Sequence, residues 1–124
     1  MDIILVDPIR RWEYKNVPCP LISVYAAPGV ANNTALITGI SGKRIRLMGA
    51  LLQSNGAAAG GITFKSASGG TQLMQVYPPP VTNNFLLLPI TDSGYIETNT
   101  GEGLFCDVVT TQVLTNLFYI TYTP

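Results

Sequence analysis

The residues that could perform chemistry in this chain are four carboxylates in its second half. Asp92, Glu97, Glu102 and Asp107 follow one another at intervals of five positions. Two carboxylates can serve as acid and base in glycoside hydrolysis when they face each other across a cleft. The first three acids lie in turn-rich sequence, where carboxylates are usually solvated. We therefore expect no catalytic role for this set and interpret the chain as a non-enzyme.

Other reactive arrangements lack essential residue types. The chain has no histidine, which removes the commonest general base and the Ser/His/acid and Cys/His nucleophilic sets. Its two cysteines cannot complete a structural zinc site. We expect both to be free, Cys106 as a small buried hydrophobe and Cys19 as a loop thiol. Calcium bound by Asp92, Glu97 and loop carbonyls is an alternative, but the spacing matches no established calcium loop. The sequence predicts no cofactor and no metal.

Charge is scarce and is sorted along the chain. Charged residues make up 11% of the sequence, against about a quarter in typical domains. All seven Lys and Arg lie in residues 1–65, whereas residues 66–124 hold four acids and no base. A fold that interleaves the two halves would pair these charges, and the alternative is that copies meet positive edge to negative edge. The net charge of zero predicts no nucleic-acid partner.

The first residues do not resemble a secretion signal or a membrane span. An acid precedes the short apolar run at residues 3–6, and no small-residue cleavage site follows it. No apolar run approaches the roughly 18 to 20 residues that a spanning helix needs. We expect a protein that is made and kept in the cytoplasm of the cell that produces it and has no membrane partner.

From Leu21 onward the chain alternates apolar and polar residues with the period of two that half-buried strands require. Gly, Pro and Asn separate about eight such strands, and no segment shows a helical period. This pattern predicts an all-β domain over residues 20–124, a jelly-roll sandwich of about eight antiparallel strands. The last two strands are expected at residues 104–113 and 116–123, with Thr115 and Asn116 in the turn between them.

The longest strand candidate covers residues 43–54. Alternation places Ile45 and Leu47 on one face and Arg44, Arg46 and Met48 on the other. The glycine that follows, at position 49, marks either a bulge or a close backbone approach.

Residues 1–19 are predicted to form an extended N-terminal arm that packs on a neighbouring protein. The segment carries the single tryptophan of the chain, Trp12, and Pro18 and Pro20 give it a stiff boundary. The alternative is an ordinary first strand on the edge of the sandwich. The candidate interface with a neighbouring protein or with another subunit consists of apolar, aromatic and basic residues of this arm and of the long strand: Ile3, Ile4, Leu5, Arg10, Arg11, Trp12, Tyr14, Arg44 and Arg46.

Three short strings carry a resemblance to a known family. They are SGKRIR at residues 41–46, FKSA at 64–67 and GYIETNTGEGL at 94–104. The family pattern is SGK-[KR]-I-R, then FKS-[AS], then G-[WY]-x-x-T-x-x-G-E-x-L. On these strings the chain resembles the capsid decoration, or cement, proteins of tailed bacteriophages, which are single jelly-roll domains. The resemblance covers roughly residues 34 to 123 and leaves the arm unmatched.

The resemblance implies a virion structural protein without enzymatic activity. Such a protein is made in the host cytoplasm, binds the major capsid protein on the capsid exterior and associates with itself, as a homotrimer rather than a dimer. A second hypothesis is a jelly-roll module of a phage tail or head fibre that binds host-surface carbohydrate. Tyr77, Tyr95 and Asn99 are the candidates for that site, because carbohydrate sites use exposed aromatics beside acids or amides.

Overall fold

The computed structural model describes residues 3–6, 11–80 and 84–124 of the chain. These residues form twelve strands and no α-helix, which confirms the all-β prediction. Within these ranges there is accordingly no helix that could cross a membrane.

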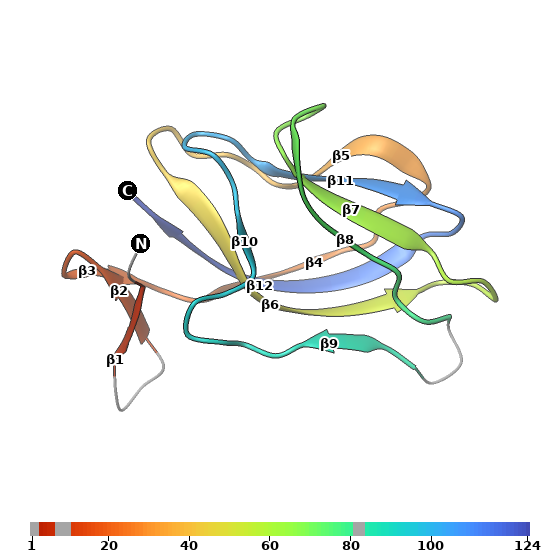
Figure 1. Ribbon diagram of the computed structural model, residues 1–124, viewed down its shortest axis with the longest axis horizontal. Helices are drawn as coiled ribbons and strands as arrows, with labels where there is room; N and C mark the ends of the chain where they lie inside the picture. The colour runs from red at the N-terminus through yellow and green to blue at the C-terminus, as the bar shows by residue number, and fades with distance from the viewer. Residues whose placement is uncertain (1–2, 7–10, 81–83) are drawn as a thin grey trace.

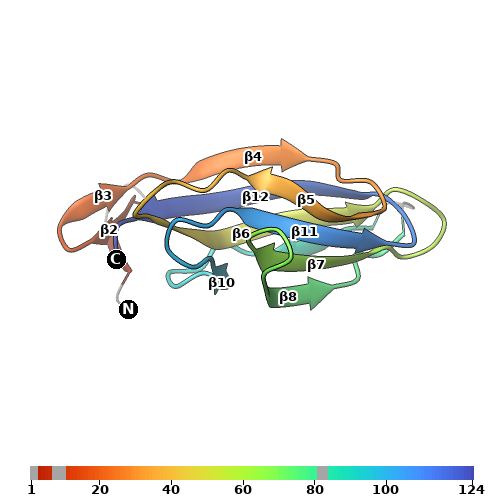
Figure 2. The same cartoon turned by 90° about the horizontal axis from the view of Figure 1, so that it is seen from above.

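The main domain consists of two antiparallel sheets packed face to face (Figures 1 and 2). The first sheet has the order β4 (Ile22–Ala26), β12 (Val113–Tyr122) and β6 (Arg44–Ser54). The far edge of β6 pairs with both β9 (Leu86–Leu88) and β10 (Ile96–Glu97). The second sheet has the order β5 (Ala31–Ile37), β11 (Leu104–Val109), β7 (Gly61–Ser66) and β8 (Thr71–Val76).

The strand order explains how residues far apart in the chain become neighbours. Because β9 and β10 share one edge of β6, the sandwich has eight strand positions. Taken in chain order, the first pairs with the eighth (β4 with β12) and the second with the seventh (β5 with β11). The third pairs with the sixth (β6 with β9 and β10), and the fourth with the fifth (β7 with β8). These are the pairings of one long hairpin rolled into two sheets, and we infer a jelly-roll connectivity from them.

The core lies between the two sheets and follows the predicted alternation. Ile45 and Leu47 face it from β6, whereas Met48 belongs to a second cluster on the opposite face. Leu104, Cys106 and Val108 face the core from β11, and Cys106 is buried there as expected. Both cysteines are free, which confirms that prediction.

Gly49 combines the two features predicted for it. The register of β6 against β12 shifts between Phe118, which pairs with Gly49, and Tyr119, which pairs with Leu47. A Cβ atom at Gly49 would lie 2.8 Å from Cγ1 of Ile90 and 3.0 Å from the carbonyl oxygen of Leu88. The glycine therefore allows the segment after β9 to pass directly over a bulge in β6.

Folding interleaves the two oppositely charged halves of the chain. Arg44 and Arg46 form ion pairs with Glu97, and Lys65 forms an ion pair with Asp107. Each pair joins a base of the first half to an acid of the second, which is the outcome expected if the halves interleave.

The prediction of a turn at Thr115 and Asn116 is wrong. Both residues lie inside β12, and the turn comes earlier, where Thr110 has a φ of 76° and the amide of Thr111 donates to the carbonyl of Val109 at 2.9 Å. The hydroxyl of Thr115 donates to the carbonyl of Ala26 at 2.8 Å. This bond satisfies a buried polar side chain within the strand, so the residue does not need solvent.

The segment predicted as an extended arm is a separate three-stranded antiparallel sheet. Its strands are β1 (Ile4–Val6), β2 (Arg11–Tyr14) and β3 (Val17–Cys19), in that order. Lys15 and Asn16 have φ values of 50° and 63°, as in the two-residue turns that suit hairpins. They reverse the chain and bring β3 against β2. Cys19, expected in a loop, consequently ends a strand and is buried.

Candidate functional site

The small sheet lies at one end of the sandwich and packs on its own domain (Figure 1). Trp12 pairs with Cys19 across β2 and β3 and is only 1% exposed. The two side chains pack in one cluster with Met48, Ile120 and Tyr122, which belong to β6 and β12. Trp12 and Cys19 thus cover part of the outer face of the first sheet in the same chain.

Tyr122 connects this cluster to a polar network. Its ring centroid lies 4.8 Å from that of Tyr14, with the ring planes inclined by 50°. The ammonium group of Lys15 lies 5.2 Å from the centroid of the Tyr14 ring, within reach of a cation–π interaction. The hydroxyl of Tyr122 donates a hydrogen bond to Oε2 of Glu97 on β10.

Glu97 is the centre of the polar network. Nη1 of Arg44 lies 3.0 Å from Oε1, and Nη2 and Nε of Arg46 lie 2.9 Å and 3.2 Å from Oε2. Nη1 of Arg46 also donates to the carbonyl of Ser93 at 2.6 Å. Both carboxylate oxygens therefore have partners, and the two arginines proposed for an intermolecular contact pair with an acid of their own chain.

The network shifts the pKa of both of its acidic members. Burial works to raise the pKa of Glu97, but hydrogen bonds from Tyr122 and Arg46 outweigh it and hold that pKa below its ordinary value. Burial, followed by the hydrogen bond to Glu97, raises the pKa of Tyr122 well above its ordinary value. At neutral pH the carboxylate is therefore ionised and the phenol is protonated, which is the combination that the hydrogen bond needs.

The calcium alternative does not fit this geometry. Its central ligand, Glu97, uses its two oxygens for Arg44, Arg46 and Tyr122. Two guanidinium groups at a carboxylate repel a cation. The described residues contain no group of three or more Cys, Asp or Glu side chains that could hold a metal ion.

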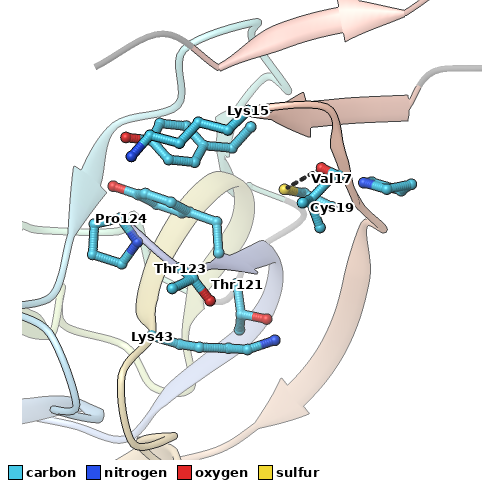
Figure 3. Close-up of a pocket in the computed structure, with 10 residues that line it drawn as sticks. Lys15, Val17, Cys19, Lys43, Thr121, Thr123 and Pro124 are labelled. Atoms are coloured by element: carbon cyan, nitrogen blue, oxygen red, sulfur yellow. Dashed lines mark hydrogen bonds between the residues drawn. The ribbon is translucent and has the colours of Figure 1, made fainter.

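A pocket of about 230 Å³ opens beside the small sheet. Tyr14, Cys19 and Tyr122 line it, together with Lys15, Lys43 and the C-terminal Pro124. Figure 3 shows Lys15 and Lys43 on opposite sides of the pocket, with the last residues of the chain between them. The pocket thus joins apolar walls to two cationic side chains. The thiol of Cys19, which also lines it, donates to the carbonyl oxygen of Val17 at 3.5 Å.

The three strings of the family resemblance meet in space. The SGKRIR and GYIETNTGEGL strings are joined by hydrogen bonds at Thr98 and Gly101. The amide of Ile45 donates to Oγ1 of Thr98 at 3.0 Å, and the amide of Gly101 donates to the carbonyl of Lys43 at 2.7 Å. The Glu97 pairs with Arg44 and Arg46 belong to the same junction.

The FKSA string forms hydrogen bonds with the loop between β10 and β11. Oγ of Ser66 donates to Oε1 of Glu102 at 2.8 Å, and the amide of Asn99 donates to the Ser66 hydroxyl at 2.9 Å. The amide of Ala67 donates to the carbonyl of Gly103 at 3.0 Å. Polar groups of the three strings therefore form hydrogen bonds with one another, and these bonds fix the loop between β10 and β11.

The residues predicted for an interface fall into different environments. Trp12 is buried, whereas Ile3 and Tyr14 are half-buried beside the same cluster. Arg44 and Arg46 lie at the same end of the molecule and pair with Glu97. Ile4 and Leu5 lie in β1 and Arg11 begins β2, and Arg10 lies outside the described residues.

Two residues at the small-sheet end of the molecule were not predicted from the sequence. Tyr122 links the small sheet to Glu97, and its position after a run of alternating apolar residues was the available signal. Val17 is 61% exposed at the start of β3. It follows directly on the Lys15–Asn16 turn, so the tip of this hairpin presents an apolar side chain next to a lysine.

The chain was compared with protein-family models and with curated proteins, and neither comparison gives a match. The candidate site is therefore defined by its geometry: a small sheet sealed onto the sandwich by Trp12, an exposed hairpin tip at Val17, and the Glu97 network behind them.

Proposed function

We propose that this chain is a non-enzymatic virion structural protein that binds the outer surface of a phage capsid and stabilises it. The observation that carries the proposal is the junction of the three resemblance strings. Arg44 bonds to Glu97 and Ser66 bonds to Glu102, so these polar side chains serve the scaffold. A decoration protein needs such a rigid shell, because its task is to hold a lattice and not to transform a ligand.

The contact end in this proposal is the small sheet. Val17 is exposed at the hairpin tip, and Lys15 and Asn16 beside it are exposed as well. Trp12 and Tyr14 do not contact the partner in this proposal. Their packing fixes the hairpin on the sandwich. A preformed tip loses little conformational freedom when it docks, and many copies on one lattice gain by multivalency. The major capsid protein is the expected partner, and the resemblance implies a homotrimer.

Binding to phage heads tests the function directly. Heads of a phage that encodes this chain, prepared without it, are mixed with the purified full-length protein and sedimented. We expect the wild-type chain to sediment with the heads in proportion to the number of capsid protein subunits. Failure of the folded wild-type chain to bind would overturn the proposed function.

Paired variants test the location of the contact. Val17→Asp places a charge at the hairpin tip, and Val109→Asp places the same charge at the C-terminal end of β11, away from the small sheet (Figure 1). Both valines are exposed, at 61% and 47%, so neither change disturbs the core. We expect V17D to weaken head binding and V109D to leave it unchanged. Equal binding by both variants would exclude the hairpin tip as the contact.

One observation favours carbohydrate binding as a second candidate function. Tyr77 is exposed, and Nε2 of Gln75 donates to its hydroxyl at 3.3 Å, so an aromatic face lies beside an amide. The other two candidates have partners: the hydroxyl of Tyr95 donates to the carbonyl of Pro89 at 2.5 Å, and Nδ2 of Asn99 donates to Glu102 at 2.9 Å. A glycan array on which binding is lost in Tyr77→Ser would support this function, and an array without hits would exclude it.

A further inference from the structure

Strand β4 is an open edge of the first sheet. It pairs with β12 on one side, and no described strand lies beyond it on the other (Figure 2). Its pairing with β12 is regular over five residues, from Ile22 opposite Tyr119 to Ala26 opposite Thr115. An edge strand presents a row of backbone amide and carbonyl groups, for which another strand is the natural partner.

The other described edges of the sandwich carry features that discourage pairing. The register of β5 against β11 shifts twice, and the register of β8 against β7 shifts once. Bulges of this kind twist an edge away from a partner. On the opposite edge of the first sheet, β9 has three residues and β10 has two, and such short edges offer little to pair with. Strand β4 has neither protection.

The chain around β4 also lacks charge. No Asp, Glu, Lys or Arg occurs between Lys15 and Lys43, a range that contains all of β4 and β5. Charged side chains on an edge are a common device against association. Their absence matters most for pairing between identical strands, because a two-fold axis would bring each charge close to its own copy.

A side chain of β4 continues a row on the outer face of the first sheet in which three of the four residues are apolar or aromatic. Tyr25 pairs with Asn116, which pairs on its other side with Leu51, and Leu51 pairs with Leu87. The four side chains lie in one row across β4, β12, β6 and β9, and Tyr25 is 60% exposed. A strand added at β4 would extend this row and cover the side of Tyr25 that faces away from the sheet.

We propose that two copies of this chain associate through antiparallel pairing of their β4 edges, which makes one continuous sheet across a two-fold axis. Full overlap of two five-residue strands is symmetric about Val24. Each Tyr25 then lies opposite Ser23 of the second copy, on the outer face. Pro20 and Pro28 flank the strand and limit the pairing to this length, because proline cannot donate to a ladder. Such a pair closes at two copies, so this edge gives a dimer and not the trimer that the family resemblance implies.

The substitution Tyr25→Lys tests the proposal with Tyr77→Lys as its control. The two tyrosines are equally exposed, at 60% and 61%, but Tyr77 lies just after β8 and away from the β4 edge. In the paired arrangement the two introduced lysines, one from each copy, would stand at diagonal positions whose backbones lie about 7–8 Å apart. This separation is within one screening length at physiological salt, so their like charges would repel. We expect the dissociation constant of the dimer to rise on the order of tenfold or more.

Light scattering after size-exclusion chromatography gives the mass of each protein as a function of concentration. Wild type and Y77K should approach twice the chain mass of 13.3 kDa, and Y25K should stay at the chain mass. A wild type that stays monomeric, or that forms a trimer, would overturn the proposal, as would a Y25K dimer as tight as that of the wild type. Hydrogen exchange of the wild-type β4 amides provides a measurement that needs no variant. Their protection should increase with protein concentration, and protection independent of concentration would also overturn the proposal.

Discussion

The hydroxyl of Tyr122 donates a hydrogen bond to Oε2 of Glu97, so the last strand of the chain is tied to β10 across the width of β6. Arg44 and Arg46 complete the arrangement from β6 itself. The Tyr122 ring also lies 4.8 Å from that of Tyr14 in the small sheet. The relationship between Tyr122 and Glu97 therefore couples the small sheet to the resemblance strings.

Removal of either partner should destabilise the fold by different amounts. Tyr122→Phe deletes one hydrogen bond to a charged group and leaves the ion pairs, which should cost about 1.5 kcal/mol in the free energy of unfolding. Glu97→Gln leaves two guanidinium groups without their counter-charge and should cost about 1–3 kcal/mol. Urea unfolding measures both. The double variant should lose less stability than the sum of the losses in the two single variants, because the two residues share one hydrogen bond. Full additivity would contradict a direct interaction.

Acid should destabilise the protein through at least two carboxylates. Burial opposes the ionisation of Glu97, but hydrogen bonds from Tyr122 and Arg46 hold its pKa below the ordinary 4.5. A hydrogen bond from the backbone amide of Asn33, together with a weaker contribution from Lys65, holds the pKa of Asp107 below the ordinary 3.8. A carboxylate whose pKa is lower in the folded state stabilises the protein above the unfolded value, and this contribution is lost as the pH falls through the folded value. The free energy of unfolding should therefore fall below about pH 4.5. A smaller fall in E97Q would assign part of the effect to Glu97.

Alkali should destabilise the protein through Tyr122. Burial and the Glu97 carboxylate raise the pKa of this phenol above its ordinary value of 10.0. Above that pH the unfolded chain loses the proton while the folded chain keeps it, so stability falls as the pH rises. Unfolding measured from pH 8 to about 11 should show a shallower fall in Y122F than in wild type. Equal slopes would contradict the stated role of the phenol, since lysine titration is common to both proteins.

The strands of the sandwich were predictable because alternation is a local signal. The inward residues of β6 and β11 follow directly from it. The small sheet was not predictable in this way, because its strands have three or four residues and its turn at Lys15 and Asn16 contains no glycine. The start of β12 was misplaced for a related reason: Thr115 and Asn116 have turn-like side chains, and a hydrogen bond to Ala26 that satisfies Thr115 becomes visible only in three dimensions.

The candidate site was predictable only in outline. The sorted charges indicated that the two halves would pair, and the ion pairs of Glu97 and Asp107 agree with this. The sequence could not show which base meets which acid, because Glu97 lies more than fifty positions from Arg44 and Arg46. Nor could it show that Trp12 faces its own domain, since an aromatic residue in a basic segment packs equally well on a partner.

Thiol reactivity should separate the two cysteines. Burial raises the pKa of the Cys106 thiol to about 12 and also raises the pKa of Cys19. Because the thiolate is the reactive form, both should resist a thiol reagent such as Ellman's reagent in the native protein and react together in denaturant. Cys19 should react first, because it lies in the small sheet beside the pocket and local opening exposes it. Faster labelling of Cys106, which lies in the main core, would contradict this order.

Gly49 provides the sharpest test of the packing between β6 and the segment after β9, because there is no space for an added methyl group. Alanine has a better strand propensity than glycine, so a gain in stability is the simple expectation. In this fold the added Cβ would meet Ile90 at 2.8 Å and the backbone oxygen of Leu88 at 3.0 Å, and overpacking of this kind costs about 1–3 kcal/mol. Gly29→Ala is the matched control, because its Cβ would have no atom within 4 Å and should change stability by about 0.5 kcal/mol or less. Urea unfolding of the two variants should therefore give a clear loss for G49A and almost none for G29A. Equal stability would mean that the segment after β9 does not cross β6 at the bulge.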